Sequence, residues 1–132
     1  MTERALETAL RARASAQTTG LPVRWPGDDA PVGDHIEFRP VRYGRSDPTI
    51  AGGKIESRGA LNLQIVMQRG TGVAARANGH ADTLAALFPF PERISFPGGC
   101  ILITKPADIR EGFLNRDTHW CVPVIVDYLA SY

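Results

Sequence analysis

Apolar residues recur along this chain with two periods, and each period predicts one kind of element. Small apolar residues return every three or four positions over residues 3 to 17, which predicts an amphipathic helix with an alanine-rich face. The same period returns over residues 73 to 87, and Pro89 ends it. Gly79 interrupts this second helix, where glycine costs about 1 kcal/mol relative to alanine, so we expect a tight contact there.

Other apolar residues alternate at the two-residue period of β-strands. The clearest case is residues 61 to 68, where leucine, isoleucine and methionine occupy every second position. Further strands are predicted over residues 35–43, broken or bulged at Pro40, and over residues 93–96, 100–104 and 120–128. Strands clustered around two helices indicate one α+β domain over residues 1–132, with a mainly antiparallel sheet and both helices packed on one face.

The segment from Gly44 to Gly59 has neither period. It is rich in glycine and holds two isolated isoleucines, so it forms either a long flexible loop or a protruding hairpin arm. Between residues 39 and 58, five basic residues outnumber Asp47 and Glu56, a local balance of 5 − 2 = +3. The basic residues are Arg39, Arg42, Arg45, Lys54 and Arg58. Either they form a solvated surface, or they meet a phosphate backbone or an acidic partner when several copies assemble.

Composition narrows the function classes. The 132 residues suit a single domain, and 43% hydrophobic with 22% charged residues is typical of a globular protein. A formal charge of +1 excludes a protein that is basic as a whole, so any charge-driven function must be local. The first residues lack the apolar stretch of a signal peptide, and we expect a cytoplasmic protein.

One motif has the context of a nucleotide-binding turn. Gly70-x-Gly72-x-x-Ala75 follows a predicted strand and opens a predicted helix, as in dinucleotide-binding domains. The fingerprint also needs a parallel strand and an acidic residue about 20 positions further on, and the nearest candidate, Glu92, precedes a strand instead. A small nucleotide-binding α/β enzyme is therefore one hypothesis, and a plain glycine turn is the other.

The remaining candidate chemistry is weak. Cys100, Cys121, His80 and His119 could supply four metal ligands, but no two of them have the local spacing that structural zinc sites show. We interpret the cysteines as buried or half-buried free thiols. No serine lies in a nucleophile elbow and no carboxylate pair has a telling spacing. These patterns favour a protein that is not an enzyme and that uses no cofactor or metal.

The order of these segments resembles a known family over nearly the whole chain. The resemblance rests on the alanine-rich first helix, Leu21-Pro22-Val23-Arg24-Trp25-Pro26, Arg58 to Val66, the Gly70-Thr71-Gly72 turn into a helix ending at Leu87-Phe88-Pro89, and the closing strand Val122 to Tyr128. In this arrangement the chain is similar to the tail terminator proteins of long-tailed bacteriophages and prophages. An alternative in the same assembly pathway is a head-tail stopper or tail-completion protein.

The resemblance implies a structural role in the virion tail. Such proteins form a hexameric ring that caps the head-proximal end of the tail tube, ends its polymerisation and forms the joint to the head connector. The implied partners are further copies of the chain, the tail tube protein, a connector or stopper protein and DNA in passage, with no membrane. Assembly would take place in the host cytoplasm. Six copies would turn the local +3 of the inter-subunit or lumen-facing arm into about +18 around a channel.

Overall fold

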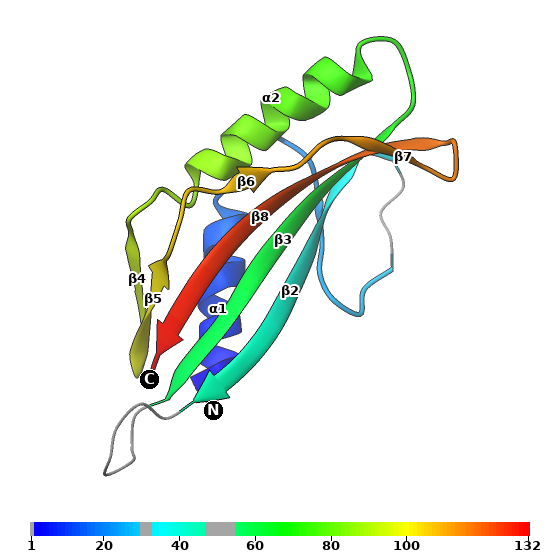
Figure 1. Cartoon of the computed structure of the whole chain (residues 1–132). Coiled ribbons are helices and arrows are strands. Elements are labelled where there is room, and N and C mark those ends of the chain that lie inside the picture. Colours follow the sequence, from blue (N-terminus) through cyan, green and yellow to red (C-terminus); the bar gives the residue numbers. More distant parts are fainter. Residues whose placement is uncertain (1, 30–32, 47–54) are drawn as a thin grey trace.

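Three long strands form the centre of the molecule: β2 (His35–Ser46), β3 (Glu56–Gln68) and β8 (His119–Ser131). The computed structural model describes residues 2–29, 33–46 and 55–132. The other elements are α1 (Thr2–Ser15), β1 (Val23–Arg24), α2 (Val73–Ala86), β4 (Arg93–Phe96), β5 (Gly99–Ile103), β6 (Asp108–Ile109) and β7 (Phe113–Asn115). Two helices with a largely antiparallel sheet make this an α+β fold (Figure 1).

Among the described residues, eight strands form one sheet in the order β1-β2-β3-β8-β5-β4, and β6 and β7 also pair with β8. All of these pairings are antiparallel except that of β1 with β2. β8 can pair with three successive short strands because its free edge is 13 residues long. This strand therefore joins the two halves of the sheet.

The core lies on one face of β3 and β8. Leu63 and Val124 are register partners at its centre, and both side chains are fully buried. Buried residues of both helices join the same hydrophobic cluster, including Leu10 of α1 and Ala77 of α2. The small side chains of the helices let them approach the sheet closely. No helix of the described chain is both long and apolar enough to cross a membrane.

The predicted strand over residues 35–43 is longer than expected, and its irregularity lies elsewhere. β2 continues to Ser46, and its register shifts between Arg42 and Gly44 rather than at Pro40. Pro40 stays in register with Leu61. Proline is tolerated there because β1 pairs only with Ile36 and Glu37, so the outer edge of β2 at Pro40 has no described strand beside it.

The Gly44 to Arg58 segment is strand at both of its ends. β2 reaches Ser46, β3 begins at Glu56, and these two residues are register partners. The connection between them, residues 47–54, lies outside the described residues, and so does Lys54.

The glycine motif at Gly70 does not lie in a nucleotide-binding fold. β4, the strand after α2, is separated from β3 by β8 and β5, and three successive antiparallel pairings make β4 antiparallel to β3. Glu92 accepts a 2.7 Å hydrogen bond from Arg13 of α1. The nucleotide-binding interpretation is therefore wrong. Gly72 instead occupies the left-handed conformation, φ +73°, at the start of α2.

The tight contact expected at Gly79 is also absent. A Cβ built at this exposed helical position would meet no atom within 4 Å among the described residues. Gly79→Ala should therefore raise the free energy of unfolding by about 0.5–1 kcal/mol, because alanine restricts the unfolded backbone and favours the helix. Gly72→Ala is the matched control and should lower it, since its φ of +73° disfavours any Cβ. Denaturant unfolding measures both, and a destabilised Gly79→Ala variant would contradict the open environment described here.

Candidate functional site

The face of the sheet opposite the core carries most of the polar side chains of β2, β3 and β8, and we call it the outer face. In Figure 1, α1 lies behind these three strands and no helix crosses in front of them. Residues of the outer face alternate with core residues, so Glu37, Gln64 and Pro123 form one row across the three strands. His35, Gln64 and Cys121 on this face are buried, whereas Arg39 and Arg58 are exposed. The part of the outer face around Arg39 and Arg58 is therefore available for contacts with other molecules.

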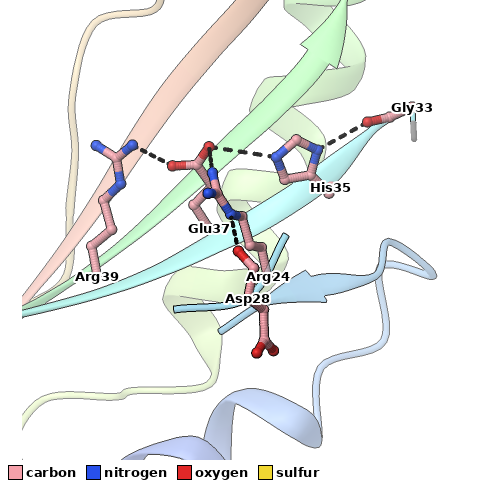
Figure 2. A network of polar contacts seen from close by, with 6 residues as sticks. All are labelled: Arg24, Asp28, Gly33, His35, Glu37 and Arg39. Carbon is pink, nitrogen blue, oxygen red and sulfur yellow. Dashed lines mark hydrogen bonds and ion pairs between the residues drawn. The ribbon is translucent and has the colours of Figure 1, made fainter. Parts of the chain in front are cut away.

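A carboxylate with three nitrogen-bearing neighbours lies on the outer face (Figure 2). Glu37 Oε1 lies 3.6 Å from Arg24 Nη1 and 3.5 Å from His35 Nε2. Glu37 Oε2 pairs with Arg39 Nη2. Only 12% of the Glu37 side chain is exposed. This network, which we call the Glu37 network, joins β1 to β2 through side chains where the backbone pairing is only two residues long.

Arg24 of the Glu37 network also stabilises a turn. Arg24 Nε donates to the Asp28 carbonyl at 3.1 Å, and the Asp28 amide donates to the Trp25 carbonyl at 3.1 Å. Pro26 and Gly27, with φ +86°, occupy the two central positions, as in a type II turn. The Asp28 carboxylate points away from the network in Figure 2. Asp29 follows it and is exposed.

The outer edge of β2 beyond Glu37 is open in the described structure. The side chains of Val41 and Tyr43 are 44% and 67% exposed, which are high exposed fractions for large apolar residues in a strand. An uncovered strand edge offers backbone N–H and C=O groups to another chain. This edge is therefore a second candidate contact surface.

The four described members of the basic set predicted from the sequence do not form one patch, and Lys54 lies outside the described residues. Arg39 and Arg58 lie on the outer face, opposite Asn62 and Leu129 respectively. Arg42 and Arg45 lie opposite Gly59 and Ser57. Ser57 and Gly59 flank Arg58 on β3 and therefore face the other way. Arg42 and Arg45, which lie opposite them, are on the core side of the sheet. Arg45 also stacks over the Tyr132 ring, 5.7 Å from its centroid.

A depression of about 490 Å³ gathers three cations on the outer face, and we call it the basic depression. Its lining includes Tyr43, Arg58, Lys105 and Arg110. Sequence patterns did not indicate Lys105 and Arg110 as site residues, because these residues lie in the connections on either side of β6. The pairing of β6 with β8 places that segment one strand away from β3, and no local pattern predicts this pairing.

Two of these cations have carboxylate partners. Lys105 Nζ lies 2.9 Å from Asp127 Oδ2, and Arg110 Nε lies 2.7 Å from Asp108 Oδ2. The hydrogen bond to Asp127 raises the pKa of Lys105, which keeps this exposed ammonium charged. Both cations remain more than half exposed. Each therefore keeps donors available to a further anion.

The cysteines are free thiols, as predicted: Cys121 is buried and Cys100 is half-buried. Burial raises the pKa of the Cys121 thiol, because its thiolate would be poorly solvated. The described residues contain no group of three or more His, Cys, Asp and Glu side chains arranged to hold a metal ion.

Comparison with known proteins identifies the family. A family model described as "Phage tail terminator protein" matches residues 5–128. The chain belongs to the phage tail terminator family. This family is a structural component of the virion tail, which agrees with the resemblance found in the sequence.

The fold of this tail terminator family member also occurs in a solved structure. That structure superimposes with a TM-score of 0.76 at 25% sequence identity, covering 99% of this chain and 94% of the other. No significant match was found among curated proteins. Family membership implies interaction with other phage tail or head proteins. We interpret the outer face and the β2 edge as candidate surfaces for such contacts.

The Glu37 network should stabilise the sheet edge. Glu37→Gln removes the one negative charge among Arg24, His35 and Arg39, and we expect a loss of about 1–3 kcal/mol in the free energy of unfolding. Glu111→Gln is the matched control: this exposed carboxylate has no ion pair with a described residue, so its loss should change stability by under about 0.5 kcal/mol. Equal, small changes in both variants on urea denaturation would show that the network adds nothing.

Proposed function

We propose that this chain caps the head-proximal end of a phage tail tube as a hexameric ring, ends polymerisation of the tube and forms the joint to the head connector. The family match over residues 5–128 carries this proposal. A closed ring of identical subunits needs two different complementary surfaces on each copy. The β2 edge and the outer face are suitable surfaces of this kind.

The arrangement proposed for the ring keeps both helices packed on the core face of the sheet. The arm from Gly44 to Arg58 would then extend from β2 and β3 to contact a neighbouring subunit or the tube. A net charge of +1 supports this assembly, because six nearly neutral copies repel one another little.

The proposed partners follow from this position. The ring would meet the tail tube protein on one side and the head connector or stopper protein on the other. DNA would pass through its channel, with Arg39, Arg42, Arg45, Lys54 and Arg58 placed at subunit contacts or toward the lumen. Assembly would occur in the cytoplasm of the host bacterium.

Deletion of the gene from its phage or prophage tests the proposal. Without a terminator the tube has no stop, so electron microscopy should show overlong tails that lack heads, and the gene supplied in trans should restore the length. Tails of normal length joined to heads would overturn the proposal. Tails of normal length without heads would instead indicate a head-tail stopper or tail-completion protein.

A second test concerns the β2 edge. Tyr43→Asp should leave the monomer folded, because the side chain is 67% exposed, but should prevent the deletion from being complemented, because a charged carboxylate would replace the aromatic ring in the contact. Phe90→Asp is the matched control: this 51% exposed aromatic follows α2 and lies outside β2, so complementation should persist. Complementation by Tyr43→Asp at the normal tail length would remove the β2 edge from the contact.

A further inference from the structure

Charge is unevenly distributed over this nearly neutral molecule. The basic depression holds Arg58, Lys105 and Arg110 against the two carboxylates Asp108 and Asp127. Arg58 is exposed and has no ion pair with a described residue. The depression therefore has an excess positive charge and donors that its own carboxylates do not use.

An acidic counterpart lies on the turn after β1. Asp28 and Asp29 are adjacent and exposed, and neither carboxylate has an ion pair with a described residue. The turn itself is ordered by the Arg24 hydrogen bond to the Asp28 carbonyl, and Arg24 is fixed in turn by Glu37. Little conformational entropy would be lost when this turn binds a partner, because its backbone is already held.

The two surfaces cannot meet within one copy. Arg24 of β1 is the register partner of Glu37, which is the register partner of Gln64 on β3. Gln64 lies six residues from Arg58 on β3, a distance of about 20 Å along the sheet. β2 and β3 also separate β1 from β8, which contributes Asp127 to the depression. In Figure 1, the blue chain before β2 extends to the right, whereas the connection from β5 to β6 lies on the left.

We propose that the Asp28-Asp29 turn of one copy docks in the basic depression of the next copy. This inference rests on the proposed ring. The contact is heterologous, since an acidic surface meets a different, basic surface, and such contacts propagate head to tail and form a ring where the rotation between copies closes. Arg58 binds one carboxylate and Lys105 with Arg110 binds the other. This pairing uses the charge complementarity of the chain itself.

Charge reversal with rescue tests the contact in the full chain. Arg58→Glu and Asp28→Lys should each weaken self-association about tenfold at low salt, because each turns an attraction into a repulsion. The double variant, Arg58→Glu with Asp28→Lys, should recover association, since the reversed charges attract again. Arg76→Glu and Asp82→Lys make the same charge changes at exposed positions of α2 and should have little effect. Sedimentation velocity over a concentration and salt series measures all five proteins against the wild type.

Each other outcome overturns the docking. A wild-type chain that stays monomeric at low salt, an association unaffected by either reversal, or a double variant that is no better than the single ones would each exclude it. Loss of duplex DNA binding in Arg58→Glu with unchanged association would assign the depression to nucleic acid instead. If deletion lengthens tails while both reversals associate normally, only the docking fails; if deletion leaves tails normal, the proposed function fails.

Discussion

The uninterrupted pairing of β3 with β8 is the constraint on which the rest of the structure depends. The two strands stay in register from Glu56 opposite Ser131 to Gln68 opposite His119. Side chains alternate with a period of two, so this single register decides for every residue of both strands whether it enters the core or the outer face. It places the aliphatic rows in the hydrophobic core, and it places Arg58 and Asp127 on the opposite face. A shift by one residue would exchange the two sets.

Much of this fold could be predicted from the sequence because its strongest patterns are local. Both helices, β2 and β8 appear within three residues of where their hydrophobic periods predict them, whereas β3 begins at Glu56, five residues before its predicted start. The short strands β6 and β7 could not be predicted, since they are held only by pairing with β8 and have no period of their own. The Gly70 motif gave a wrong prediction for a similar reason. A strand, a glycine turn and a helix are determined by local sequence, whereas the pairing partner of the next strand is not.

The candidate site was predictable only in part for the same physical reason. The sequence identified an excess of basic residues between Arg39 and Arg58, but the alternation of β2 and β3 and the register shift near Arg42 distribute the described ones over both faces. The residues that do gather, Arg58 with Lys105 and Arg110, are far apart in sequence and meet through the strand register. Composition can therefore indicate that charge matters locally, whereas the sheet decides which charges act together.

The open edge of β2 combines attraction with selectivity. An exposed strand edge with Val41 and Tyr43 would pair with many chains if nothing else lay on it. Pro40 removes one backbone donor from this edge, and Arg39 and Arg42 place charge beside it, so an unmatched strand gains little by adding there. A partner that supplies complementary charge gains both the apolar contact and the ion pairs. The charged residues that limit indiscriminate pairing at this edge would thus also select a partner of complementary charge.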